Sequence, residues 1–272
     1  MPVIAITREM GSLGKDVARG LGEELGLPVI YHELIDHLAD RMRVRKSHVI
    51  RLLDGSAGLL ERLTADKTSL SIFTADEVFG VAARGAVIRG WGATHLLREV
   101  PHAVCVRVCA PFELRKRRMM ERVGSDDGER VAEEIRVNDE AHGAIMRRHF
   151  DLHWTEPEHY DLVLNTKRVS VAECVSEVLA LVRSPQFVET ERAREQLADL
   201  ALAACVRAAL RRAPETREAA VQVEAQSGRV TLSGAGSTDE MLAFVEVASA
   251  VPGVRDVAYR THPGAEIRPR FH

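Results

Sequence analysis

The sequence has few aromatic residues, no long apolar run and no marked excess of charge. Phe, Trp and Tyr make up 4% of its 272 residues, which leaves few platforms for stacking nucleic-acid bases. Lys and Arg number 37 against 40 Asp and Glu, giving a formal charge of −3, so nucleic acid is not an expected partner. No apolar stretch approaches the roughly 20 residues of a membrane span, and the N-terminus lacks a basic segment followed by an apolar signal core.

Cysteine is also scarce, with four residues in the chain. The closest pair, Cys105 and Cys109, falls in one strand-like run, where the two are about 13 Å apart and beyond disulfide reach. This pattern favours a reducing compartment, and we expect a cytoplasmic protein. The 46% hydrophobic and 28% charged residues are typical of a globular chain.

Residues 1–183 alternate between short apolar runs and segments with helical spacing. The runs predict five strands, at 3–6, 29–31, 86–88, 103–109 and 162–164. Between them, the spacing predicts helices after the first strand, within 33–83, and at 112–122, 129–150 and 170–182. Strands that alternate with helices indicate an α/β domain with a parallel sheet and helices on both faces.

The composition changes after Arg183, where Ser-Pro-Gln precedes a charged stretch rich in Ala and Glu. We therefore divide the chain into a domain at 1–183, a linker at 184–194, a small α+β domain at 195–264 and a tail at 265–272. In the second domain we expect helices at 197–212 and 238–250 and strands at 221–224, 230–232 and 254–259.

A glycine-containing loop, Gly11-Ser12-Leu13-Gly14-Lys15, stands between the first strand and the first helix. Backbone N–H groups and the positive end of a helix bind phosphate at such a junction. The standard motif is G-x-x-x-x-G-K-[ST], which Gly14 and Lys15 fit, but Glu9 replaces the first glycine and Asp16 the hydroxyl residue that holds Mg²⁺. From the motif alone, a phosphate loop and an ordinary turn with a surface lysine are equally supported.

Five segments extend this pattern along the chain, and they lie at 6–16 (ITREMGSLGKD), 25–35 (LGLPVIYHELI), 87–90 (VIRG), 110–118 (APFELRKRR) and 153–162 (HWTEPEHYDL). In this order they resemble the cytidylate-kinase-like branch of the nucleoside monophosphate kinases, over about residues 2–182. The loop of that branch carries Gly-Ser-Gly-Gly, a basic and an acidic residue, a variant that Lys15 and Asp16 fit.

The resemblance implies a P-loop kinase fold and phosphoryl transfer from ATP, with Mg²⁺, to a nucleoside monophosphate such as CMP or dCMP. The residues that it implies for the ATP phosphates are Gly11, Ser12, Leu13, Gly14, Lys15 and Asp16. The catalytic residues that it implies are Lys15, Arg115, Arg118 and Arg147. For the acceptor it implies Asp36, Trp91, Asp139 and Arg148. Without the family context, the basic run that contains Arg115 and Arg118 is better explained as a solvated helix face.

The sequence also departs from the family. Trp91 follows Gly90 where the branch usually has an arginine, and Asp139 is followed by Glu140, Ala141 and His142 instead of an arginine cluster. Loss of one fixed cation from such a site costs about 10³-fold in rate or more. A weakly active or inactive nucleotide-binding sensor is therefore the alternative function, and a structural adaptor is a third. A position of Trp91 at the acceptor end of the site and a position in the hydrophobic core are equally supported.

Four histidines, His142, His149, His153 and His159, cluster in the sequence, but no Cys or acidic residue recurs at a matching spacing, so we expect no metal site. The segments 221–224, 228–234 and 251–257 resemble the BON domain over about residues 195–262. That family is associated with phospholipid surfaces and protein partners, and it carries no catalytic residues. Because the tail has no basic patch or aromatic stripe, we expect it to bind a protein partner or a second copy of the chain rather than a membrane.

Overall fold

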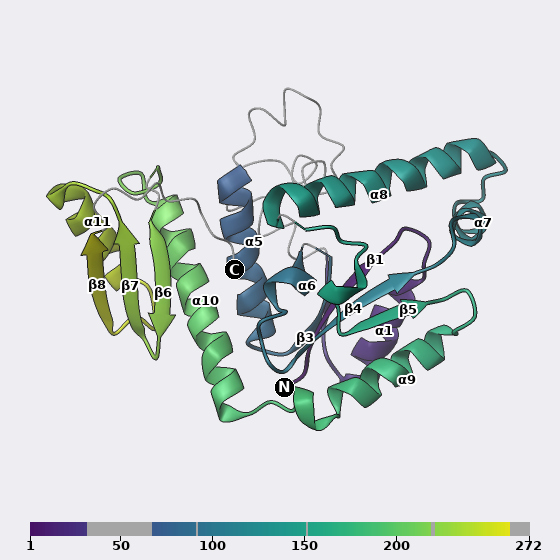
Figure 1. Ribbon diagram of the computed structural model, residues 1–272, viewed down its shortest axis with the longest axis horizontal. Coiled ribbons are helices and arrows are strands. Elements are labelled where there is room, and N and C mark those ends of the chain that lie inside the picture. Colours follow the sequence, from purple (N-terminus) through teal and green to yellow (C-terminus); the bar gives the residue numbers. More distant parts are fainter. Residues whose placement is uncertain (32–66, 91, 151, 219–220, 262–272) are drawn as a thin grey trace. The chain divides into compact units, whose positions relative to one another are not determined.

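The computed structural model describes residues 1–31, 67–90, 92–150, 152–218 and 221–261 (Figure 1). By internal contact the chain divides into two compact units, Met1–Ala65 with Arg84–Glu189, and Asp66–Ala83 with Thr190–His272. The helices that the sequence predicts between 33 and 66 lie outside the described residues. Among the helices that are described, none is both long and apolar enough to cross a membrane.

The first unit contains the predicted parallel sheet, with the strand order β2-β3-β1-β4-β5. Its strands are β1 (Val3–Arg8), β2 (Val29–Ile30), β3 (Ala86–Arg89), β4 (Ala103–Cys109) and β5 (Leu162–Asn165). All four pairings are parallel; β1, in the centre, pairs Ile6 with Arg89 of β3 and with Val106 of β4. The central strands are apolar on both faces, as strands covered on both sides must be.

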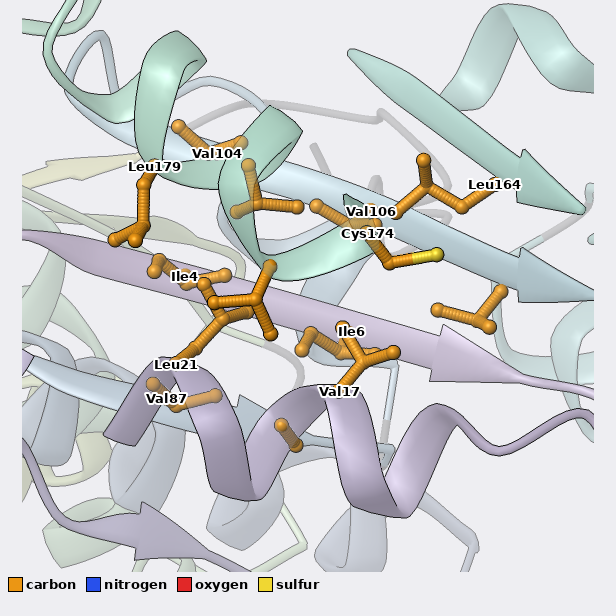
Figure 2. Packing of buried hydrophobic residues seen from close by; sticks show 14 residues of the cluster. Ile4, Ile6, Val17, Leu21, Val87, Val104, Val106, Leu164, Cys174 and Leu179 are labelled. Carbon is orange, nitrogen blue, oxygen red and sulfur yellow. The ribbon is translucent and has the colours of Figure 1, made fainter. Parts of the chain in front are cut away.

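One face of this sheet is covered by α1 (Gly14–Leu25) and α9 (Val171–Val182). Ile4 and Ile6 of β1 pack there against Val17 and Leu21 of α1 (Figure 2). On the other face the short helix α6 (Ala93–Leu96) contacts β1 and β4, and the Cys105 thiol of β4 donates to the Thr94 carbonyl at 3.2 Å. The alternation of side chains along β4 explains why Cys105 faces away from the α1 side.

Because all five strands run the same way, their carboxyl ends meet at one edge, which is where open α/β sheets bind ligands. The chain leaves β1 at this edge and enters α1 through residues 9–13. The helix α7 (Phe112–Val123) starts just after β4 and packs on α8 (Gly128–Phe150) through Met119, Val131 and Ile135.

The second unit contains α10 (Glu191–Arg212), β6 (Gln222–Gln226), β7 (Arg229–Gly234), α11 (Thr238–Ser249) and β8 (Asp256–Thr261). The strand β7 is antiparallel to β6 and parallel to β8. The core of this sheet and its helices includes Val206 and Leu210 of α10, Val223 of β6, Leu232 of β7 and Phe244 of α11. The helix α11 begins at a capping box, in which Ser237 and Glu240 satisfy each other's backbone N–H groups.

The helix α5 (Lys67–Ala82) belongs to this second unit, although in sequence it lies between β2 and β3. It packs on α10, and the Arg211 Nε of α10 donates to the Ser69 hydroxyl at 2.7 Å. Arg207 of α10 is half-buried; desolvation lowers its pKa, and the charge of Asp76 on α5 opposes that shift. The division by sequence places 67–82 in the domain 1–183, whereas its contacts group it with the C-terminal unit.

Two further boundaries differ from the sequence-based expectation. The helix α10 begins at Glu191 rather than Leu197, because Thr190 caps it by accepting from the Ala193 N–H at 3.1 Å. Residues 191–194 of the segment taken as a linker are therefore helical. The strand β8 begins at Asp256 rather than Val254 and continues to Thr261.

Candidate functional site

The loop between β1 and α1 depends on glycine for its path. Gly11 has φ +81°, and a Cβ there would lie 2.8 Å from the backbone oxygen of Arg115. A Cβ on Gly14 would lie 2.6 Å from the Cβ of Arg8. Leu13 is left-handed as well, with φ 65° and ψ 14°, a conformation that costs a residue with a side chain about 1–2 kcal/mol. Strain of this kind persists where the surrounding structure imposes it, often at functional sites.

Several backbone N–H groups of this loop are left unused. The Ser12 N–H donates to the Glu9 carbonyl at 3.1 Å, but those of Leu13, Gly14 and Lys15 have no partner within the residues that the structure describes. They lie at the N-terminus of α1, where the helix dipole favours an anion. A left-handed residue followed by a helix start is also the backbone form of an anion-binding nest.

Lys15, which the sequence places at the phosphates, is exposed on the first turn of α1 and forms no ion pair with any described residue. Asp16 beside it accepts from Arg19 Nη2 through Oδ1, at 3.0 Å. The Ser12 hydroxyl is fully buried and donates to the Val108 carbonyl at 2.9 Å. The Ser12 side chain is therefore not available to a ligand.

Glu9, at the position of the standard motif's first glycine, joins the loop to β4 and α7. Its Oε1 accepts from Arg107 Nη2 at 2.6 Å, and its Oε2 accepts from the Ala110 N–H at 3.1 Å. The Arg115 Nε lies 3.4 Å from the same Oε2. Glu9 departs from the standard motif, but in the structure its carboxylate is surrounded by the charged groups of Arg107 and Arg115 and the neutral N–H of Ala110.

Two of the predicted site residues, Arg115 and Asp139, meet as an ion pair with 2.7 Å between Nη1 and Oδ2. Arg115 is 6% exposed and donates in addition to the carbonyls of Ala110 and Met10, at 3.0 and 3.1 Å. Its Nε and Nη1 are thus engaged by the chain itself, and the pair holds the loop, α7 and α8 together.

Arg118 reaches the loop through Thr166. Its Nη1 and Nη2 donate to the Thr166 hydroxyl and carbonyl at 2.9 and 2.8 Å, and that hydroxyl donates to the Ser12 carbonyl at 2.9 Å. Arg147, on α8, is exposed, and a Cβ on Gly143 would lie 3.2 Å from both Arg147 Nη1 and Trp154 Nε1. The absence of a side chain at Gly143 leaves the room that these two groups occupy.

Three of the predicted acceptor residues cannot be placed. Asp36 and Trp91 lie outside the described residues, and for Arg148 the description covers its helix but not its side chain. Among the described residues, Glu156, Glu158 and His159 bring three ligand atoms within 4.8 Å of one another. Two of these side chains are exposed, and His159 Nε2 lies 3.2 Å from Glu156 Oε2.

Sequence reasoning assigned no role to Arg89, the last residue of β3. It is 7% exposed, its Cζ lies 4.0 Å from the centroid of the Tyr31 ring, and its Nε has no hydrogen-bond partner among the described residues. Burial, and after it the charge of Arg8, lowers the pKa of Arg89, while Tyr31 and Asp16 act in the opposite direction. The signal in the sequence was a lone arginine that ends an apolar run.

His142 of α8 also had no assigned role. Its Nε2 lies 3.2 Å from the Thr7 hydroxyl of β1, and its ring meets Trp154 edge to face with 4.4 Å between centroids. Burial, followed by the charges of Arg8 and Arg107, lowers the pKa of His142 to about 4. The imidazole is therefore neutral at pH 7.

Comparison with known sequences and structures identifies both parts of the chain. Residues 3–168 match the sequence model of the cytidylate kinase-like family, and residues 188–262 match that of the BON domain. The first match covers more than half of the chain, which therefore belongs to the cytidylate kinase-like family. The resemblance inferred from the sequence and the predicted fold class, a P-loop kinase sheet with a small α+β domain, are both confirmed.

Among solved structures, an uncharacterized protein from Eubacterium ventriosum ATCC 27560 has 20% identity and a TM-score of 0.52, over 68% of this chain and 99% of that one. Shikimate kinase from Acinetobacter baumannii has 14% identity and a TM-score of 0.39, over 67% of this chain and 93% of its own. TT1252 from Thermus thermophilus has 23% identity and a TM-score of 0.39, over 67% of this chain and 99% of that one. None of the curated proteins matches the chain.

Proposed function

We propose that the chain transfers a phosphoryl group from ATP to a nucleoside monophosphate, with CMP or dCMP as the acceptor. The observation that carries this proposal is Lys15, an exposed cation without an ion pair among the described residues, beside the unused N–H groups of Leu13 and Gly14. Membership of the cytidylate kinase-like family supports the same reaction class.

The loop fits the phosphates of ATP, the group that would supply the transferable phosphoryl. Lys15 and the N–H groups of Leu13, Gly14 and Lys15 itself would hold the phosphate oxygens, because charge-assisted hydrogen bonds are about twice as strong as neutral ones. For Mg²⁺, which prefers oxygen ligands, the fitting residue is Asp16 on the first turn of α1. The Ser12 hydroxyl does not fit, because it is committed to the Val108 carbonyl.

One observation favours the second candidate, a protein that binds nucleotides without turning them over. Arg115 and Arg118 are the cations expected to neutralise the transferring phosphoryl group, and both are hydrogen-bonded to groups of the chain itself. Phosphoryl transfer depends on such fixed charges and on alignment. Binding and turnover must therefore be measured separately.

The deciding experiment is a coupled assay of ADP release across the nucleoside monophosphates, with and without Mg²⁺, together with calorimetric titration of ATP. Lys15→Ala should weaken ATP binding at least tenfold, as expected for loss of a charged phosphate contact. Arg84→Ala is the matched control, because Arg84 is exposed in the turn before β3, at the opposite edge of the sheet. ATP and CMP binding without ADP release would favour the second candidate. Equal ATP affinity in Lys15→Ala and the wild type would remove the loop from the site.

For the C-terminal module we propose docking to a protein partner, and a cytoplasmic location for the whole chain. The match to the BON domain, a family without catalytic residues, supports docking to a protein. The four free cysteines support a location in the reducing cytoplasm. Sedimentation of the whole chain tests self-association, and flotation with anionic phospholipid vesicles tests lipid binding. Flotation with the vesicles would contradict a protein-docking role.

A further inference from the structure

Arg89 is a buried cation whose hydrogen-bonding capacity is partly unused within the described part of the chain. Its side chain stacks on Tyr31, yet among the residues that the structure describes its Nε has no acceptor and no carboxylate is hydrogen-bonded to its guanidinium. A buried donor without an acceptor costs free energy, and a buried charge without a counterion costs more. Asp16 is near enough to act on Arg89 electrostatically, but its Oδ1 already accepts from Arg19.

The surroundings of Arg89 add positive potential. The parallel register pairs Ile6 with Arg89, and Arg8 follows two residues later on the same face of β1. The side chain of Arg8 lies directly against Gly14, the first residue of α1. Two guanidinium groups and the N-terminus of a helix thus converge at the carboxyl edge of β1 and β3.

This edge is also the topological switch of the sheet. The chain passes from β1 through α1 to β2 on the β3 side, whereas β3 connects to β4 on the other side of β1. Open α/β sheets bind their ligands at the carboxyl ends of the strands at such a switch. On the β4 and β5 side the loop is held by hydrogen bonds with Val108 and Thr166, and Thr166 in turn accepts from Arg118.

We propose that Arg89 binds the phosphate monoester of the acceptor substrate. The inference rests on the proposed function and adds to it the residue that selects a phosphorylated acceptor over the free nucleoside. The Nε–H of Arg89 donates to a phosphate oxygen, which supplies the acceptor that the described residues do not provide. A doubly charged phosphate suits this place because it also compensates the buried charge of Arg89.

The test compares CMP, cytidine and ATP as calorimetric ligands for the full chain. We expect Arg89→Gln to weaken CMP binding by about ten- to a hundredfold, the range for a hydrogen bond between charged groups, and to leave cytidine and ATP binding unchanged. Arg84→Gln, with the same change in charge, is the control and should bind CMP as the wild type does. Equal CMP affinity in Arg89→Gln and Arg84→Gln would overturn the inference.

Inorganic phosphate separates this inference from the proposed function. Millimolar phosphate should raise the Tm of Lys15→Ala, but not that of the double variant Lys15→Ala/Arg89→Gln, in which both proposed anion sites are changed. If that pattern holds while no nucleoside monophosphate binds, the proposed function fails and the anion site stands. If phosphate has no effect and CMP binds no better than cytidine, Arg89 binds no phosphate.

Arg89→Lys covers the case in which Arg89→Gln does not fold, because it keeps the charge and removes Nε. It should retain the fold and lose most of the preference for CMP over cytidine. A lysine variant with the wild-type preference would show that Nε is not the donor.

Discussion

The Asp139 carboxylate of α8 and the Arg115 guanidinium of α7 form an ion pair of 2.7 Å directly behind the glycine loop. Arg115 contacts the loop itself through the Met10 carbonyl. The pair therefore links α8 to the residues around the N-terminus of α1. Both residues were expected to contact substrate, and in the structure they form an ion pair with each other.

Replacing Asp139 with Asn should lower the free energy of unfolding by about 1–3 kcal/mol, because Arg115 stays buried with part of its charge uncompensated. Urea unfolding measures the loss. The exposed pair of Arg136 and Glu133 gives the control, and Glu133→Gln should change stability by less than about 0.5 kcal/mol. An Asp139→Asn protein with unchanged stability but a raised KM for the acceptor would instead make Asp139 a substrate ligand.

Some parts of the fold were predictable because local sequence patterns mark them. Strands such as 103–109 are buried on both faces, so an apolar run marks them, and the loop was visible as Gly14 and Lys15 after such a run. The start of α10 was missed because its first turn is polar and is fixed by one cap, Thr190. Hydrophobic spacing carries no information about a cap of this kind.

The site was less predictable, because its charges are organised by contacts between distant segments. Glu9 meets Arg107 and Arg115 only after β4 and α7 are in place. In the same way, α5 joins α10 across more than a hundred residues of sequence. The sequence identifies which residues are charged, but their partners depend on the completed fold.

The pH dependence of stability should reflect His142. Its pKa is lowered to about 4 in the folded chain, first by burial and then by Arg8 and Arg107, whereas an unfolded histidine titrates near 6.5. The unfolded state then binds more protons between these values, so the free energy of unfolding should fall as the pH falls from about 6.5 to 4. The contribution is at most roughly 3 kcal/mol.

Urea unfolding at pH 7.5 and at pH 5 measures this effect. His142→Gln removes the titrating group and should lose less stability on acidification than the wild type, although His95, with its pKa also lowered to about 4, still contributes. His153→Gln is the control because its side chain is exposed. Equal acid sensitivity of His142→Gln and the wild type would contradict a neutral imidazole at this position.

A fragment of residues 1–189 should be less stable than the full chain. It retains α5 but lacks α10, which packs on α5 and holds Ser69 through Arg211. Apolar side chains of α5 such as Phe73 and Phe79 are buried in the full chain, so we expect a loss of at least about 3 kcal/mol and rapid proteolysis within 67–83. A fragment of residues 1–261, which keeps α10, is the control. Identical unfolding midpoints of the two fragments would show that α5 does not need α10.

Gly11→Ala should destabilise the protein by more than the cost of placing alanine in a left-handed conformation. Gly11 has φ +81°, and a Cβ there would lie 2.8 Å from the backbone oxygen of Arg115, which cannot turn away as a side chain does. The left-handed conformation costs alanine about 1–2 kcal/mol, and the steric conflict adds about 1–3 kcal/mol. Urea unfolding measures the sum, and calorimetry should show weaker ATP binding because the loop must shift.

Gly26 provides the control for this prediction, because it also has a positive φ, +63°, but nothing lies within 4 Å of the Cβ that alanine would add. Gly26→Ala should therefore lose only the conformational part, about 1–2 kcal/mol, and bind ATP as the wild type does. The difference between the two variants isolates the contact between the loop and Arg115. If Gly11→Ala and Gly26→Ala lose the same stability, the loop does not pack on the backbone of α7 as the structure describes.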